Sequence, residues 1–149
     1  MTNPHAPSED QLASRLRFAV ARMARLLRQQ DQSGFGPTLI AALATIERHG
    51  PITLGELAGR EQVAPPTITK VVEKLEANGL VTRTTDVADR RVNRVAVTTK
   101  GAKQLAVYRG RRTEWLASRL QDLSPDEQER LVAALPVLER LIEVHEVRP

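Results

Sequence analysis

Apolar positions along the chain recur at two different periods, and the change of period separates helices from a hairpin. In residues 10–30 the apolar stripe returns every three or four positions, which is the helical spacing. The residues of this stripe are Leu12, Leu16, Val20, Met23 and Leu27. The same spacing predicts further helices over residues 38–48, 54–61, 65–78 and 99–121, and a last one from residue 125 to at least Ile142.

Local signals predict where these helices begin and end. Residues 53–56 (Thr-Leu-Gly-Glu) and 124–127 (Ser-Pro-Asp-Glu) have the capping-box pattern that starts a helix. Gly50, which precedes a proline, and Gly79 are expected to end helices, because glycine accepts the left-handed conformation. Pro136 lies inside the last helix and is expected to kink that helix rather than end it.

The period changes to two after Gly79. Residues 80–85 and 94–98 alternate as strands do, and a polar, basic stretch over residues 86–93 separates them. Two short strands flanking such a loop form a hairpin with a charged tip, and Thr98 is expected to cap the helix that follows. The predicted fold class is therefore mainly α with a small β-hairpin.

Composition excludes several classes of chemistry. The chain has no cysteine, so disulfides, thiolate catalysis and cysteine-ligated zinc are excluded. The three histidines, His5, His49 and His145, do not have metal-ligand spacing. We find no nucleophile–base pair and no phosphate-binding glycine motif, so we expect no enzyme activity, no metal and no cofactor.

The hydropathy of the chain and its N-terminal residues indicate a cellular location. No apolar run approaches the ~20 residues of a membrane span. The N-terminal residues are polar and lack the basic-then-apolar order of a signal peptide. We therefore expect a cytoplasmic protein without a membrane partner.

Positive charge is concentrated in the middle of the chain. The formal net charge is +4, and residues 60–112 hold 12 Lys or Arg against 5 Asp or Glu. The remaining residues hold 10 basic against 13 acidic side chains. A basic patch on a folded domain favours a polyanion partner, although a solvated basic face is the alternative.

The order helix, short helix, turn, helix, hairpin is that of a winged helix-turn-helix. In the helix over residues 65–78, four apolar side chains share one face: Ile68, Val71, Val72 and Leu75. The outer positions are short hydroxyls, a proline and two cations: Pro66, Thr67, Thr69, Lys70 and Lys74. Such a helix can enter the major groove of DNA while its apolar face is anchored. The alternative is that these are ordinary surface residues.

The sequence resembles the MarR (multiple antibiotic resistance regulator) family of bacterial transcription factors. The resemblance rests on residues 65–81 (PPTITKVVEKLEANGLV) with Arg83, on 86–91 (DVADRR) and on 95–101 (VAVTTKG). It departs from the family at Val87, where proline is frequent, and at Ala64, where a serine-like helix cap is frequent.

The resemblance implies a single domain over residues 1–149 that forms a homodimer. Its winged helix-turn-helix lobe spans residues 37–100, and dimerisation helices span 9–30 and 102–147. Expected interface residues are the apolar ones of the terminal helices: Leu12, Leu16, Leu131, Leu135, Leu138 and Ile142. The alternative is that both helices close the core of a single chain.

The family also implies binding to double-stranded DNA at an inverted repeat. Arg91 matches the wing arginine that enters the minor groove, where an A·T-rich sequence attracts it, and Asp89 is expected to position Arg91. Arg90 and Arg94 are candidates for phosphate contacts, and Arg83 is included among the DNA-binding residues. Solvated wing charges are the alternative.

Many family members release DNA when a small anionic aromatic molecule binds near the dimer helices. The candidate ligand-binding residues here are Phe18, Arg22, Phe35, Tyr108 and Trp115, with ordinary core packing as the alternative. We expect a ligand-responsive repressor. A winged-helix module that binds protein is the alternative function, and the wing is expected to lack the apolar anchors that such a module exposes.

Overall fold

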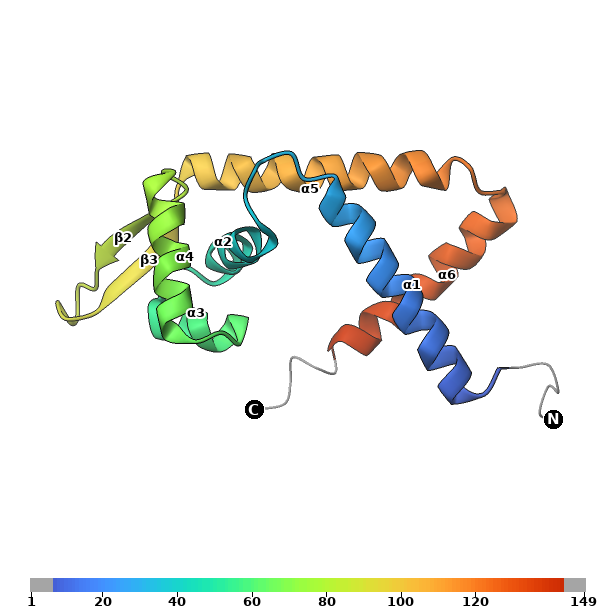
Figure 1. The fold of residues 1–149 in the computed structure, drawn as a ribbon, viewed down its shortest axis with the longest axis horizontal. Helices are drawn as coiled ribbons and strands as arrows, with labels where there is room; N and C mark the ends of the chain where they lie inside the picture. The colour runs from blue at the N-terminus through green and yellow to red at the C-terminus, as the bar shows by residue number, and fades with distance from the viewer. Residues whose placement is uncertain (1–6, 144–149) are drawn as a thin grey trace. The chain divides into compact units, whose positions relative to one another are not determined.

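The structure, a computed structural model, describes residues 7–143 as six helices and three strands (Figure 1). In chain order these are α1 (Glu9–Gln29), α2 (Pro37–His49), β1 (Ile52–Thr53), α3 (Leu54–Glu61), α4 (Pro65–Ala77), β2 (Val81–Thr85), β3 (Asn93–Val97), α5 (Thr99–Leu120) and α6 (Pro125–Glu143). The chain divides into two compact units within α5, between Arg112 and Thr113. Among the described residues, no helix has the length and apolarity that crossing a membrane requires. The mainly α fold class with a β-hairpin is confirmed.

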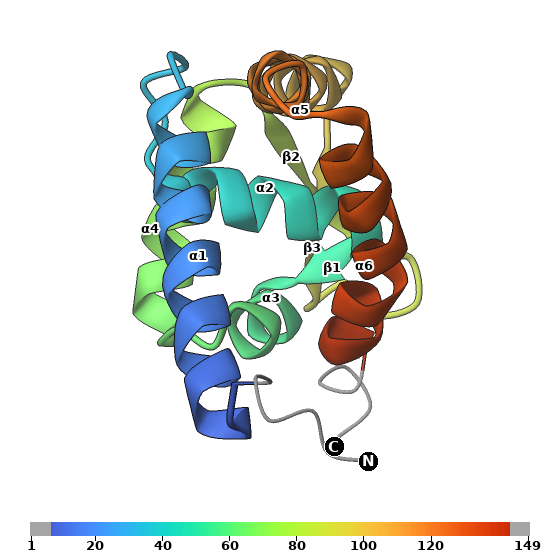
Figure 2. The ribbon, with the colours of Figure 1, turned by 90° about the vertical axis from the view of Figure 1, so that its right-hand side faces the viewer.

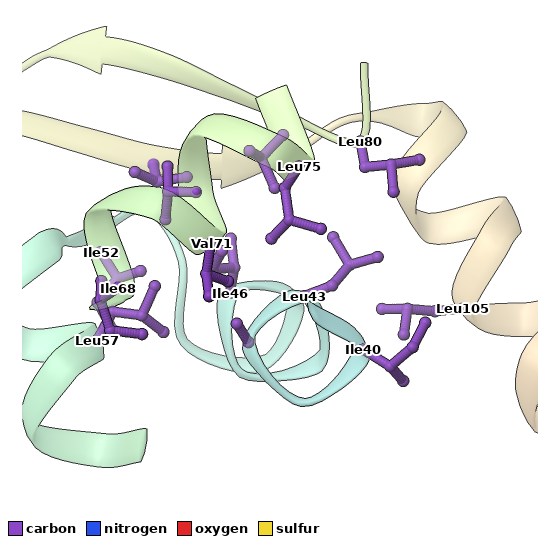
Figure 3. Close-up of a cluster of buried hydrophobic side chains, with 14 of the residues drawn as sticks. Ile40, Leu43, Ile46, Ile52, Leu57, Ile68, Val71, Leu75, Leu80 and Leu105 are labelled. Atoms are coloured by element: carbon purple, nitrogen blue, oxygen red, sulfur yellow. The ribbon is translucent and has the colours of Figure 1, made fainter. Parts of the chain in front are cut away.

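The core of the first unit lies between α2, α3 and α4. The expected inner face of α4 is buried at all four positions, Ile68, Val71, Val72 and Leu75. Figure 3 shows Leu105 of α5 beside Ile40 of α2, within the same buried cluster. The helix-turn-helix is therefore one packed body with the first part of α5.

The sheet has one strand more than the sequence predicts. Strand β3 pairs antiparallel with β2, as expected for the hairpin, and also with β1 (Figure 2). Ile52 lies opposite Val95, and Thr53 lies opposite Arg94. A strand of two residues has no period of its own, so the pattern could not indicate it.

Both capping boxes are confirmed. The Thr53 N–H donates to Glu56 Oε2 (2.9 Å) and the Glu56 N–H donates to Thr53 Oγ1 (3.2 Å). Ser124 and Glu127 make the same reciprocal bonds at the start of α6. A further capping box that the sequence analysis missed joins Ser8 and Gln11 at the start of α1.

The two helix-ending glycines differ. Gly79 is left-handed as predicted, with φ of 71°. Gly50 ends its helix as predicted, but the expectation of a left-handed conformation is wrong there, because its φ of −73° and ψ of 160° are extended. A Cβ at Gly50 would lie 2.5 Å from the carbonyl oxygen of Ile46. Glycine is needed there because space is lacking, not because of backbone handedness.

A dense junction joins the end of α4 to the start of α5. The Thr98 hydroxyl donates to the Gly79 carbonyl (2.6 Å), and Lys100 Nζ donates to the Asn78 carbonyl (2.8 Å). The Gly101 N–H donates to Thr98 Oγ1 (3.1 Å), which confirms the expected cap. Gly101 approaches the Leu80 backbone so closely that a Cβ would overlap the Leu80 carbonyl oxygen.

Both terminal helices carry exposed apolar side chains within their own units. No residue of α1 is buried, and Leu12 and Leu16 are exposed and half-buried. In the second unit α6 continues through Pro136, so the expectation that this proline does not end the helix is confirmed. The four predicted interface residues of α6 are all outside the buried class: Leu131, Leu135, Leu138 and Ile142.

We predict that Gly101→Ala destabilises the fold by about 1–3 kcal/mol, the usual cost of overpacking a close contact. Gly110→Ala in the same helix is the matched control, because a Cβ there meets nothing within 4 Å. That control should stabilise the helix by roughly 0.5–1 kcal/mol. Urea unfolding of both variants at one protein concentration measures the difference, and equal effects would contradict the close approach.

Candidate nucleic-acid interface

The outer face of α4 presents side chains rather than free backbone amides. Pro65 and Pro66 lack N–H groups, and the Thr67 N–H donates to the Ala64 carbonyl (2.9 Å). The Thr69 hydroxyl also turns inward and donates to the Pro65 carbonyl (3.0 Å). An anion at this helix start would therefore meet the helix dipole and side chains, without the usual cradle of N–H groups.

A groove lies along this face, between α4 and the start of α2. Leu39 and Val71 form its apolar part, and it is completed by four outer residues of α4, Pro66, Thr67, Lys70 and Lys74. Both lysines are exposed. The structure thus brings together most of the α4 residues that the sequence predicts as DNA-binding.

Arg83 lies on β2 and faces α4. Its Nε lies 3.1 Å from Glu76 Oε2 of α4, and the side chain is half-buried. The arrangement ties the hairpin to the end of α4 and leaves Arg83 less exposed than the wing arginines.

The tip of the hairpin is organised by two carboxylates. Asp86 Oδ1 accepts from the Ala88 N–H (2.7 Å) and the Asp89 N–H (3.2 Å). Asp89 accepts from the Arg91 N–H (3.0 Å), from Arg91 Nε (3.1 Å) and from Arg91 Nη2 (3.3 Å). The expected carboxylate–guanidinium pair is therefore present, and it holds an Arg91 side chain that is 92% exposed.

These bonds perturb the wing carboxylates. The Arg91 guanidinium, and after it the Arg91 N–H, lower the pKa of Asp89. The Arg94 guanidinium and the N–H groups of Ala88 and Asp89 lower the pKa of Asp86. Both groups keep their charge, and the wing keeps its bonds, at neutral pH.

Arg94 and Val87 of the wing differ from the sequence expectation. Arg94 is paired with Asp86 and Glu56 and is half-buried, whereas Arg90 is exposed and has no ion pair within the described part of the chain. Val87 is fully exposed, so the expectation that the wing lacks an apolar anchor is wrong for this one side chain.

The predicted ligand-binding residues have different surroundings. Phe18 and Arg22 share a shallow groove on α1. Phe35 packs against the core of the first unit and Tyr108 is buried in it, as the core-packing alternative expects. Trp115 belongs to the second unit.

A cation that the sequence analysis missed lies beside Tyr108. The guanidinium carbon of Arg112 lies 3.9 Å from the centre of the Tyr108 ring. The Arg112 Nε is buried without a hydrogen-bond partner, and burial lowers the pKa of this arginine. The spacing of four residues on one helix could have indicated the pair.

Over residues 7–143 no group of His, Asp and Glu side chains is arranged to hold a metal ion. The exposed cations of α4 and of the hairpin tip, Lys70, Lys74, Arg90 and Arg91, suit a polyanion.

Comparisons with known proteins agree with this arrangement. The family model of the MarR family matches residues 36–92. An uncharacterised HTH-type transcriptional regulator, ML2140 of Mycobacterium leprae, is 38% identical over 91% of this chain and 96% of its own length. The HTH-type transcriptional repressor MdtR of Bacillus subtilis is 29% identical over 85% of this chain and 84% of its own.

Among solved structures, a MarR family protein from Bacillus stearothermophilus superimposes with a TM-score of 0.76 at 27% identity. The match covers 93% of this chain and 99% of that one.

We predict that Arg91→Ala raises the pKa of Asp89 toward the ordinary value of about 3.9, because the largest cause of its lowering is removed. Since the folded pKa is lowered, the pair stabilises the wing above the unfolded pKa, and this contribution is lost as pH falls through the folded pKa. Arg90→Ala is the matched control and should leave the Asp89 titration unchanged. Carboxyl NMR titration measures both, and equal shifts would contradict the pairing.

Proposed function

The chain belongs to the MarR family of DNA-binding transcriptional regulators, and from this premise we propose that it is a homodimeric repressor that a small anionic aromatic molecule releases from DNA. The family and the relatives reported above are regulators of transcription and not enzymes. The observation that carries the proposal is an α4 helix buried completely on one side and bearing hydroxyls and cations on the other.

In this proposal α4 lies in the major groove and the hairpin reaches the adjacent minor groove. Thr67, Lys70 and Lys74 face base edges and phosphates from α4. Arg91 enters the minor groove from the wing tip, and Arg90 contacts a phosphate. The exposure of these side chains supports the assignment, as does the Asp89 carboxylate that orients Arg91.

Two copies of the chain would pair through α1 and α6. Each helix exposes large apolar side chains within its own unit, among them Leu12 of α1 and Leu135 and Ile142 of α6, which supports the family's mode of assembly. A two-fold dimer presents two α4 helices, so the proposed DNA site is an inverted repeat with half-site centres about 34–36 Å apart.

One relative and two cation–aromatic pairs support the regulatory part of the proposal. MdtR, a relative, is named a repressor. An aromatic anion needs a cation and an apolar surface, and the structure offers Arg22 beside Phe18 and Arg112 over Tyr108. On the wing as the structure describes it, Val87 is the one exposed large apolar side chain that favours the alternative of a protein-binding module.

Selection of duplexes from a random pool by the full chain tests the proposal directly. Enrichment of a two-fold symmetric site supports a dimeric DNA reader. Enrichment of nothing, or of asymmetric sites, would count against it. Screening small aromatic carboxylates for release of the selected duplex tests the regulatory part.

We predict that Arg91→Ala weakens binding to the selected duplex much more than Lys74→Ala does. Arg91 is assigned to the groove, so its loss should cost about 1–3 kcal/mol of discrimination and relax any preference for A·T-rich flanks. Lys74 is at most a phosphate contact, so its loss should weaken all duplexes alike and shift the salt slope by about one. Titrations at several salt concentrations on selected and scrambled DNA separate the two. If Arg91→Ala lowers the affinity for both duplexes by the same factor, the wing contributes only its positive charge and does not recognise the sequence.

We predict that Leu135→Glu, which places a charge in the exposed stripe of α6, converts the dimer to monomers or aggregates. Arg140→Glu places the same side chain on the opposite side of the helix and is the matched control. Light scattering measures the mass of each variant. A Leu135→Glu chain that remains a soluble dimer would refute the assignment of this stripe.

A further inference from the structure

Arg94 lies where three segments of the first unit meet. It is in β3, the middle strand, opposite Thr53 of β1 on one side and Thr84 of β2 on the other. Its Nε donates to Asp86 Oδ2 at 2.6 Å, and its Nη1 lies 3.7 Å from Glu56 Oε2. One guanidinium therefore connects the beginning of the wing loop with the first turn of α3.

Each of these carboxylates also holds backbone. Asp86 Oδ1 accepts from the Ala88 and Asp89 N–H groups, which turn the chain toward the wing tip. Glu56 Oε2 accepts from the Thr53 N–H (2.9 Å) and the Thr53 hydroxyl (3.0 Å) in the cap of α3. A displacement of Arg94 would therefore reach the wing through Asp86 and the helix-turn-helix through Glu56.

We propose that Arg94 is a positioning residue for DNA recognition, which holds the wing at a fixed angle to the helix-turn-helix and does not itself contact phosphate. The inference rests on the proposed DNA-binding role of the wing. It replaces the expectation from sequence that Arg94 is a phosphate contact.

Charge and exposure both favour the positioning role. The Arg94 side chain is 35% exposed, against 92% for Arg91 at the tip. The Arg94 guanidinium already faces two carboxylates, Asp86 and Glu56, which offset its charge toward a phosphate. The guanidinium fork suits this task because it can meet two carboxylates in fixed directions, which the point charge of a lysine cannot.

Three variants distinguish a positioning residue from a phosphate contact, because the two roles predict opposite results. Arg94→Lys keeps the charge but loses the fork. Asp86→Asn keeps Arg94 but breaks the charged pair. Arg90→Gln removes an exposed wing cation and serves as the reference for a phosphate contact. The full chain is titrated with a duplex selected from a random pool and with a scrambled duplex, at several salt concentrations.

For a positioning residue, Arg94→Lys and Asp86→Asn each lower affinity for the selected duplex by about tenfold, the size of one lost groove contact. Affinity for the scrambled duplex and the salt slope of Arg94→Lys stay unchanged, whereas Arg90→Gln lowers the slope by about one. In both Arg94→Lys and Asp86→Asn, hydrogen exchange at the Ala88 and Asp89 amides becomes faster. The midpoint of thermal unfolding of each variant stays within a few degrees of the wild-type value.

For a phosphate contact, Arg94→Lys binds like the wild-type chain, and Asp86→Asn binds both duplexes more tightly because an acidic group is gone. Either result overturns the positioning role. A wild-type chain that does not distinguish selected from scrambled DNA overturns the proposed function itself. If Arg94→Lys or Asp86→Asn unfolds, Glu56→Gln tests the connection between Arg94 and α3. Glutamine can still cap α3 but carries no charge that attracts Arg94.

Discussion

The complete burial of one side of α4 is the constraint on which the rest of the lobe depends. Ile68, Val72 and Leu75 are fully buried against α2, α3 and the sheet. Burying each such side chain is worth about 1.5–3 kcal/mol, whereas an exposed ion pair such as Arg83–Glu76 is worth about 0–1 kcal/mol. Apolar contacts therefore hold α4, and its outer lysines are left for a polyanion. A helix held this firmly presents its outer face in one fixed orientation.

The wing is held by the opposite means. No side chain from residue 86 to residue 94 is in the buried class, so hydrogen bonds to Asp86 and Asp89 take the place of a core. Such bonds compete with water and are individually weak. The two parts proposed to face DNA are thus held by different means: α4 is fixed by packing, whereas the wing is held at its base by Arg94 and at its tip by hydrogen bonds to Asp86 and Asp89. In the proposed complex, the exposed Arg91 side chain at the tip meets a minor groove whose width varies with sequence.

The parts predictable from sequence are those whose signal is local. The inner face of α4 follows from spacing, and the caps at Thr53 and Ser124 follow from residues three positions apart. The parts that could not be predicted depend on distant neighbours. Strand β1 exists only because β3 accepts it, and the extended Gly50 reflects the nearby Ile46 carbonyl. Likewise the pairing of Arg94 with Glu56 could not be predicted, because Glu56 is far away in the sequence.

The exposed stripes of α1 and α6 connect assembly with recognition. A chain that leaves Leu12, Leu135 and Ile142 in water carries an apolar surface that a partner would cover. A single α4 helix offers only a few hydroxyl and lysine side chains for contact with DNA, so one helix alone would bind a given sequence weakly. When a second copy is joined to the first, its binding becomes intramolecular, and the combined affinity can exceed either half by about 10²–10⁴. In the proposed dimer, pairing through the apolar faces of α1 and α6 would in this way make the few contacts of α4 and Arg91 specific.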